Sequence, residues 1–258
     1  MIPAEGGFCP PKSGRARMHR MNAAVPLPAT PELFDPARLD RSDTLVRREP
    51  FPFLVATHQL PDAARAELER DFPRYTGAGF FPYEAKDCGP SVNRLIADLT
   101  DPSVATAVGA KLGIANLGAF PTLVTLCRAL NKRHGTIHTD SRSKVATALL
   151  YLNESWPDTS AGCFRFLNRI DSVDDMAAPE IKPLYGNFVV FKRADNSFHG
   201  HLPFEGERRV IQVAWLTSED EKLRKTKRGK LSRLFKKIFG SMDKRIGAER
   251  ADNAAHKD

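Results

Sequence analysis

Short apolar runs separated by turn-rich loops dominate the second half of the chain. From residue 120 onward, β-branched and aromatic residues gather in runs that are typical of β-strands. A β-rich region that follows a helical one predicts an α+β fold, mainly β, in which a sandwich or barrel carries flanking helices. The predicted strands are residues 123–127, 144–152, 163–167, 188–192 and 210–216.

The first half of the chain has the pattern of helices around one short strand. The run Phe51–Val55 is typical of a strand. Pro61, followed by strong helix formers, predicts the start of a helix, because proline fits the first helical position. Two further helices are predicted at residues 90–99 and 102–112.

Proline marks the N-terminal boundary of the predicted domain. Seven of the 19 prolines fall before residue 37, among small and polar residues. We therefore predict a disordered, Pro-rich N-terminus over residues 1–48. The expected domain then spans residues 49–218, with its β core at 120–217, and a basic tail follows at 219–258.

The positive charge of the chain is concentrated in that tail. The net charge is +8, and residues 219–258 alone hold 13 Lys and Arg against 7 Asp and Glu. The body is therefore nearly neutral, and we predict no nucleic-acid partner. Apolar residues in the tail follow helical spacing beside basic ones, which predicts an amphipathic helix that docks on the body, on a second subunit or on an anionic membrane surface. They are Leu231, Leu234, Phe235, Ile238 and Phe239.

Composition excludes several other classes of protein. With 258 residues, 41% of them hydrophobic, the chain can form one substantial core. No apolar run approaches the ~18 residues of a transmembrane helix, and the first twenty residues lack the apolar segment of a secretory signal. The four cysteines are scattered without a CxxC pair, which favours a reducing compartment, so we expect a cytoplasmic protein.

Two His-x-Asp tripeptides are candidates for a metal site. With 7 His and 18 Asp in the chain, chance alone supplies roughly half such a tripeptide, so position must distinguish them. His256-Lys-Asp258 stands at the C-terminal end with nothing strand-like around it. His138-Thr-Asp140 directly precedes a predicted strand, where side chains at i and i+2 point to the same face. His138 and Asp140 are therefore the predicted pair of ligands.

A third ligand has to come from another strand. His199 and His201 are the candidates within the β region, besides His134. Arg209 follows His199 by ten residues and opens an apolar strand. A buried guanidinium needs a bidentate anionic partner, so this arginine indicates a carboxylate-binding site. Two His, one carboxylate and an Arg together describe a non-haem Fe(II) centre beside such a site.

Five motifs follow one another between about residues 120 and 217, some 40% of the chain. They are His138-x-Asp140; Ala-Leu-Leu-Tyr151-Leu-Asn-Glu-Ser-Trp156; Ala-Gly162-Cys-Phe-Arg-Phe; Pro183-Leu-Tyr-Gly186-Asn-Phe-Val-Val-Phe191; and His199 with Arg209 through Trp215. This ordered set resembles the Fe(II)/2-oxoglutarate-dependent oxygenases, in particular their prolyl-4-hydroxylase-like branch. The resemblance implies a double-stranded β-helix, a cupin-like jelly-roll variant with the metal in its mouth.

The resemblance also implies roles for single residues. His138, Asp140 and His199 match the metal ligands, and the ten-residue distance to Arg209 favours His199 over His201. Arg209 matches the basic residue that pairs with the distal carboxylate of 2-oxoglutarate.

Tyr151 completes the expected cosubstrate site with Arg209. Tyr151 matches a tyrosine that hydrogen-bonds the same carboxylate. Arg208 competes with Arg209, but strand alternation with Trp215 favours Arg209, with Ile211, Val213 and Trp215 on the same inward face. The candidate substrate contacts are His201, Arg165 and Arg128, the last of which stands where many members of the branch have Tyr.

The implied activity is hydroxylation of an unactivated C–H bond, with 2-oxoglutarate and O₂ consumed and succinate and CO₂ released. The implied cofactor is Fe(II), with ascorbate as a candidate reductant. We expect a peptidyl, prolyl-type substrate, and the alternative is a small molecule or a sugar-like metabolite. A rival of another class is an inactive jelly-roll module that binds or senses a ligand.

Overall fold

The computed structural model describes residue 1 and residues 32–239, with side chains as far as residue 229. A seven-stranded antiparallel sheet forms the centre of the molecule. Its strands in spatial order are β1 (Leu45–Arg47), β2 (Phe53–Ala56), β7 (Phe188–Lys192), β5 (Lys144–Tyr151), β9 (Gly206–Leu216), β4 (Thr122–Leu130) and β3 (Phe80–Pro82). The predicted strands within this sheet are therefore confirmed.

A smaller sheet faces the large one. It pairs β6 (Arg165–Phe166) with β8 (His199–Gly200), and isolated bridges such as His138 with His199 extend it. Two facing antiparallel sheets joined in this way form the double-stranded β-helix that the sequence predicted.

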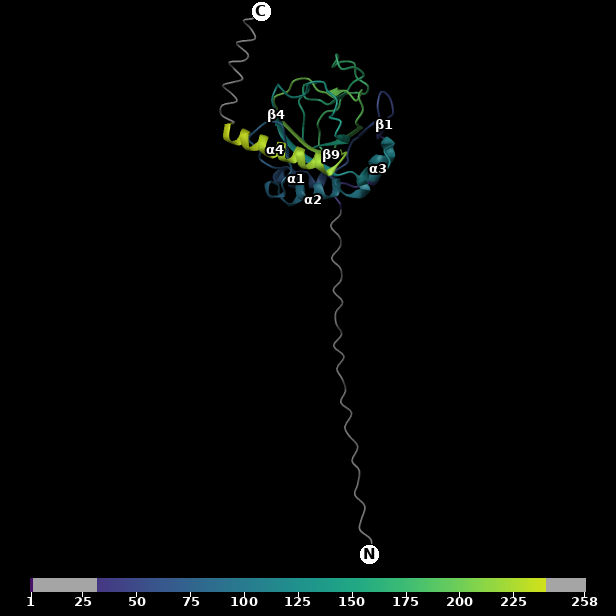
Figure 1. The fold of residues 1–258 in the computed structure, drawn as a ribbon, viewed down its shortest axis with the longest axis vertical. Helices are drawn as coiled ribbons and strands as arrows, with labels where there is room; N and C mark the ends of the chain where they lie inside the picture. Colours follow the sequence, from purple (N-terminus) through teal and green to yellow (C-terminus); the bar gives the residue numbers. More distant parts are fainter. Residues whose placement is uncertain (2–31, 240–258) are drawn as a thin grey trace, which may run out of the picture. The chain divides into compact units, whose positions relative to one another are not determined.

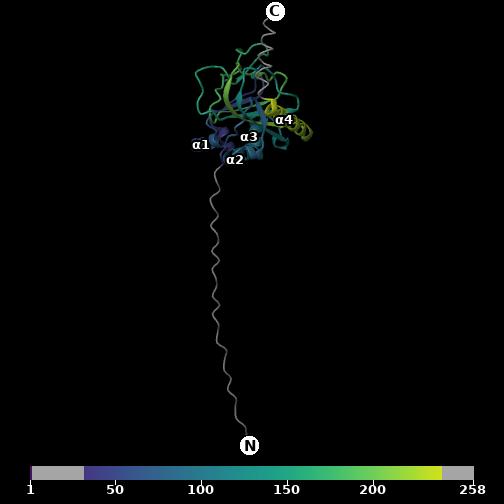
Figure 2. The same ribbon diagram turned by 90° about the vertical axis from the view of Figure 1, so that its left-hand side faces the viewer.

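Helices cover the outer face of the large sheet. In both views of the ribbon, α1 (Arg65–Asp71), α2 (Pro90–Leu99) and α3 (Pro102–Leu112) lie together on one side of the β-structure (Figures 1 and 2). The chain also forms four short 3-10 helices: η1 (Pro36–Asp40), η2 (Asp62–Ala64), η3 (Ala85–Asp87) and η4 (Leu117–Ala119).

Local sequence signals place the ends of α3. Asp101 precedes the helix, and its carboxylate accepts a hydrogen bond from the backbone N–H of Ser103 at 2.8 Å. Pro102 occupies the first helical position, where its missing N–H costs nothing. Gly113 ends the helix with φ of 65°, a left-handed conformation that favours glycine. The predicted helix at 102–112 is confirmed to the residue.

Two hydrophobic clusters share the large sheet. Alternate residues of β5 divide between them: Leu150 joins the cluster beneath the helices, whereas Leu149 and Tyr151 join the cluster between the two sheets. Strand β9 alternates in the same way, with Val210 between the sheets. Ile211, Val213 and Trp215 pack toward the helices, so the inward face that we predicted for these three residues is wrong. A strand buried on both faces carries no polar alternation that would mark its inner side.

The ordered chain begins earlier than predicted. Leu33, Phe34 and Leu39 are buried in the cluster beneath the helices. The carboxylate of Asp98 accepts hydrogen bonds from the backbone N–H groups of Leu33 and Phe34, at 2.7 and 3.3 Å. The prediction of disorder up to residue 48 is therefore wrong for residues 32–48, because their apolar side chains complete the core. Its remainder, residues 2–31, lies outside the described residues.

The predicted C-terminal helix is present as α4 (Glu219–Phe239). It packs on β3, where a Cβ at Gly229 would lie 2.4 Å from Cγ of Pro82, so only glycine allows this approach. The predicted apolar stripe from Leu231 to Phe239 falls on side chains outside the described ones. Among the helices that the structure describes, none is long and apolar enough to cross a bilayer.

Candidate metal centre

Three side chains meet where the small sheet begins. His138, Asp140 and His199 each offer a ligand atom, and these atoms all lie within 4.8 Å of one another. Backbone hydrogen bonds fix the two histidines in register: the N–H of His138 donates to the carbonyl of His199 at 3.1 Å, and the reverse bond is 3.0 Å long. The three predicted metal ligands are thus brought together by strand pairing.

Each histidine is held in the tautomer that suits a metal. Nδ1 of His138 lies 2.8 Å from the carbonyl oxygen of Thr136, and Nδ1 of His199 lies 2.9 Å from that of Ser197. Because a carbonyl oxygen can only accept, Nδ1 carries the proton in both rings. The lone pair on Nε2 is then available to a metal ion.

The carboxylate of Asp140 is held ionised. Thr147 donates its hydroxyl to Oδ2 at 2.6 Å, and the ammonium of Lys144 lies 2.7 Å from Oδ1. Burial alone would raise the pKa of Asp140, but Lys144, together with His199 and the hydrogen bond from Thr147, lowers it to about 2. Asp140 therefore presents a negative charge over the whole physiological pH range.

His199 is held neutral by its surroundings. Its ring is buried between Phe191 and Phe164, with ring centroids 4.4 and 5.7 Å away. Burial lowers the pKa of His199 to about 4, although Asp140 opposes this shift. A neutral imidazole is the form that binds a metal, and His138, which is exposed, leaves the centre open to solvent on one side.

A cationic corner lies deeper between the sheets. The guanidinium of Arg208 donates from Nη2 to the hydroxyl of Tyr151 at 3.2 Å and from Nε to the carbonyl of Gly162 at 2.9 Å. Tyr151 is fully buried, and burial raises its pKa to about 12, so the phenol stays protonated. Arg208 and Tyr151 together can bind a carboxylate.

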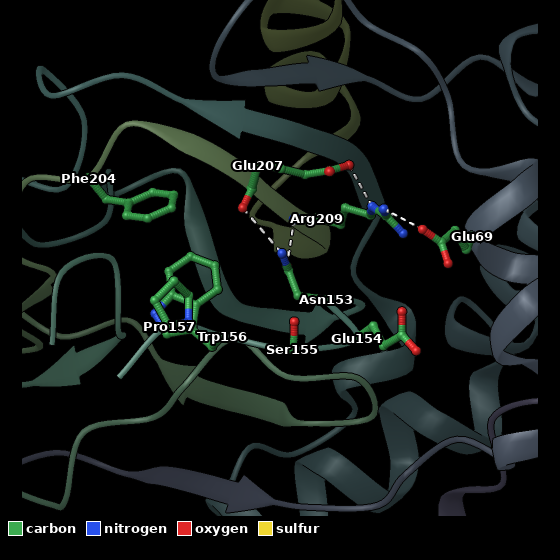
Figure 3. A pocket seen from close by; sticks show the side chains of 9 residues that line it. All are labelled: Glu69, Asn153, Glu154, Ser155, Trp156, Pro157, Phe204, Glu207 and Arg209. Atoms are coloured by element: carbon green, nitrogen blue, oxygen red, sulfur yellow. Dashed lines mark hydrogen bonds and ion pairs between the residues drawn. The ribbon is translucent and has the colours of Figure 1, made fainter. Parts of the chain in front are cut away.

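Arg209, which we predicted for that role, points the other way. Its Nε and Nη2 each lie 2.7 Å from a carboxylate oxygen, of Glu207 and Glu69 respectively. Figure 3 shows this ion-pair network on the wall of a cavity of about 350 Å³, whose lining includes Asn153, Trp156 and Phe204. Adjacent residues of a strand point to opposite faces, so Arg209 shares the outer face with Trp215 while Arg208 faces the interior.

His201 is buried rather than facing solvent. Its Nδ1 donates to the carbonyl of Leu202 at 2.7 Å, and its ring lies against Gly135, where a Cβ would come within 2.1 Å of Cε1. Burial, reinforced by the charge of Arg208, lowers the pKa of His201 to about 4. The ring therefore packs beneath the loop that leads to His138 and lies near Arg208.

The two other predicted substrate contacts are occupied by ion pairs. Arg165 is buried and pairs with Asp174 and Glu180, both at 2.8 Å, which corrects its prediction as a substrate contact. Arg128 pairs with Glu207 at 2.9 Å and so belongs to the network around Arg209. Their partners are distant in the sequence, and no local pattern indicates them.

Two residues that hydrogen-bond the carboxylate of Asp140 were not predicted as part of the site. Lys144 and Thr147 follow it by four and seven residues, and both appeared only as members of a predicted strand.

The donor set of two imidazoles and one carboxylate suits Fe(II) rather than softer metals. Cys127 and Cys163 are buried and lie outside this cluster, within the described part of the chain.

Residues 125–217 match the family model of the 2OG-Fe(II) oxygenase superfamily. Among solved structures, a prolyl-4-hydroxylase from Pseudomonas putida is 19% identical, with 64% of this chain and 92% of that chain covered and a TM-score of 0.46. A prolyl hydroxylase from Trichoplax adhaerens, in complex with a hypoxia inducible factor peptide fragment, is 14% identical over 66% and 86% of the chains, with a TM-score of 0.44. No curated protein matches the chain.

Proposed function

We propose a role for each residue of the centre, starting from the match of residues 125–217 to the family model of the 2OG-Fe(II) oxygenase superfamily. The chain is a 2-oxoglutarate-dependent non-haem iron dioxygenase. His138, Asp140 and His199 hold Fe(II), and Arg208 with Tyr151 binds the distal carboxylate of 2-oxoglutarate. The observation that carries the proposal is the convergence of these three ligand atoms within 4.8 Å, each on a side chain that a hydrogen-bond partner holds in place.

Fe(II) and 2-oxoglutarate, when bound, supply O₂-dependent hydroxylation of a C–H bond with release of succinate and CO₂. The protein's part is to bind and orient. The carbonyls of Thr136 and Ser197 accept from Nδ1 of His138 and His199, so Nε2 is the ring atom of each that would bind the metal. Lys144 and Thr147 hold the carboxylate of Asp140 in place. Buried aromatic side chains around His199 exclude water from that side of the centre.

We propose a peptidyl, prolyl-type substrate. Two observations support this: the order of motifs from His138 to Trp215, and the exposure of His138, which leaves the centre accessible to a bulky substrate. A small molecule or a sugar-like metabolite is the alternative substrate. Incubation with a panel of proline-containing peptides, 2-oxoglutarate and iron distinguishes the two, because a peptide hydroxylase adds the mass of one oxygen atom to a peptide. Succinate without any modified peptide favours the alternative.

If His138, Asp140 and His199 hold the metal, replacing any one of these side chains by alanine should abolish metal binding. His138→Ala and Asp140→Ala should each abolish measurable Mn(II) binding by calorimetry, used as an oxygen-stable probe of the Fe(II) site, because two remaining ligands compete poorly with water. Succinate formation should be lost with it. An inactive ligand-binding module would instead bind metal without producing succinate from 2-oxoglutarate.

His256→Ala is the matched control, because it removes the histidine of the other His-x-Asp tripeptide. It should alter neither Mn(II) affinity nor succinate formation. Parent-like metal binding in both His138→Ala and Asp140→Ala would contradict the assignment.

A further inference from the structure

Three cationic side chains from separate elements converge on the segment that carries Asp140. Lys144, at the start of β5, lies 2.7 Å from Oδ1 of Asp140. Arg193, which follows β7, donates from Nε to the backbone carbonyl of Asp140 at 3.3 Å. Lys225, on α4, donates to the hydroxyl of Ser141 at 3.0 Å. The predicted iron centre is thus bordered by positive charge from β5, from the segment after β7 and from the C-terminal helix.

The packing of α4 holds Lys225 at this border. Gly229, one turn further along α4, lies against Pro82 so closely that a side chain would clash. Burial lowers the pKa of Lys225, and the neighbouring charge of Lys144 lowers it further. Two ammonium groups that repel each other are therefore kept together by the docking of the helix.

Once iron is bound, no carboxylate near the centre is left to neutralise these two lysines alone. Fe(II), the carboxylate of Asp140, the two carboxylates of 2-oxoglutarate and Arg208 sum to zero. Arg193 pairs with Asp195, and Arg224 pairs with Glu221. Among the described residues Lys225 forms no ion pair, and the ammonium of Lys144 then shares its only ion-pair partner, Asp140, with the metal.

The remaining charged residues of α4 and of the segment after Asp140 do not neutralise Lys144 and Lys225. Glu219 pairs with Lys222 on the same helix at 3.7 Å. Arg142 and Asp220 are exposed and opposite in sign, so they cancel. A positive charge of about two therefore remains beside Asp140 and Ser141, next to the iron centre. Charge complementarity favours a substrate that brings negative charge to this place.

We propose that Lys225 and Lys144 bind an anionic group of the primary substrate, a carboxylate next to the hydroxylated residue. The inference rests on the proposed function and deepens it: the substrate is an acidic peptide, with aspartate or glutamate beside the target proline. Helix α4 then contributes a specificity residue to the oxygenase domain, although it follows the last strand of that domain.

The test measures binding without turnover. The full-length protein is loaded with Mn(II) and 2-oxoglutarate under nitrogen and titrated into three fluorescent decapeptides. These differ only in the two residues that flank one proline, which are glutamate, glutamine or lysine. We expect the glutamate peptide to bind at least tenfold tighter than the glutamine peptide, and the lysine peptide to bind most weakly.

Variants on α4 assign the preference to Lys225. In Lys225→Ala the preference for glutamate over glutamine should fall below threefold, and Lys225→Arg should retain it. Lys227→Ala is the matched control, because Lys227 is exposed on the same helix. It should keep the full preference, and thermal melts should show that all variants are folded.

Each outcome of these measurements either supports or contradicts the proposed anion site. Equal binding of the glutamate and glutamine peptides overturns it, as does a preference that survives in Lys225→Ala. If no peptide binds, the parent protein and Lys225→Ala are titrated with inorganic sulfate by calorimetry. Sulfate binding that is lost in Lys225→Ala supports the anion site. Equal behaviour of the parent and Lys225→Ala overturns it. A charge preference without any hydroxylated peptide would leave the anion site standing and contradict the proposed prolyl substrate.

Discussion

Arg208 and Arg209 are neighbours in the chain with opposite environments. Arg208 lies between the sheets, where its partners are the hydroxyl of Tyr151 and a backbone carbonyl, both neutral. Arg209 lies on the outer face, where two carboxylates already neutralise it. A buried guanidinium with neutral partners only can still bind an anion, whereas a doubly paired one cannot do so without losing a partner.

The first residue-scale prediction separates the two arginines. Arg208→Ala should weaken 2-oxoglutarate binding to the Mn(II)-loaded protein by about 2–5 kcal/mol, because it removes a charge-assisted contact in a buried site. Arg209→Ala should leave this affinity within a factor of three. Calorimetry of both variants provides the comparison. The reverse ranking would return the role to Arg209, as strand alternation with Trp215 had suggested.

The second residue-scale prediction concerns Tyr151. Tyr151→Phe keeps the ring in place and removes only the hydroxyl that contacts Arg208. The affinity for 2-oxoglutarate should fall by about 0.5–1.5 kcal/mol, the range for one hydrogen bond between protein and ligand or side chain. A loss as large as that of Arg208→Ala would mean that Tyr151 positions the guanidinium as well as the carboxylate.

At the scale of elements, one carboxylate joins two helices. Asp71 ends α1, and its Oδ2 accepts hydrogen bonds from the backbone N–H and the hydroxyl of Ser91, at 2.9 and 2.8 Å. Ser91 lies in the first turn of α2, whose N–H groups have no partner within the helix. Asp71 therefore fixes the angle at which α2 begins and helps to hold the helical layer on the sheet.

This link predicts a pH-dependent stability. Burial opposes ionisation, but the hydrogen bonds from Ser91 outweigh it and lower the pKa of Asp71 below its ordinary value. A carboxylate with a lowered pKa stabilises the fold above the pKa of the unfolded chain, and this contribution is lost as the pH falls through the folded-state pKa.

Asp71→Asn should therefore lower the free energy of unfolding by about 1–3 kcal/mol at pH 7. The difference from the parent should shrink steadily below pH 4. Urea denaturation of both proteins between pH 7 and pH 3 measures it. A difference that stays constant over this range would show that the charge of Asp71 plays no part.

At the scale of the whole molecule, α4 joins the C-terminal segment to the iron centre. The helix packs on β3 through Gly229, and Lys225 reaches the residue after Asp140. The sequence predicted an apolar stripe further along, at Leu231 to Phe239, as the docking face, with the body, a second subunit or an anionic membrane as its target. Docking of α4 on the body involves its first three turns, and the stripe itself stays a prediction.

Deletion of residues 219–258 tests what α4 contributes. We expect a lower free energy of unfolding, because the deletion uncovers Pro82 and the neighbouring face of β3. Mn(II) affinity should fall less than tenfold, since His138, Asp140 and His199 all remain. Urea denaturation and calorimetry on the deleted and full-length proteins provide the measurement. Complete loss of Mn(II) binding would show that α4 is needed to form the centre.

The sequence by itself determined most helices and strands of the core, and it marked His138 and Asp140 as the candidate ligand pair. Apolar runs, proline at helix starts and the Asp101 and Gly113 signals around α3 act over a few residues, so they can be found without knowledge of the fold. His138 and Asp140 could be predicted because a strand brings residues i and i+2 to one face, and family resemblance added His199.

Only the tertiary structure decided which side of β9 faces the interior. Both faces of that strand are covered by apolar neighbours, so Arg208 and Arg209 cannot be told apart by alternation of apolar and polar residues. The burial of Arg165 and the approach of Lys225 to Ser141 were also decided there. These contacts join residues that are distant in the chain, and their energy depends on burial and charge that exist only after the layers have packed.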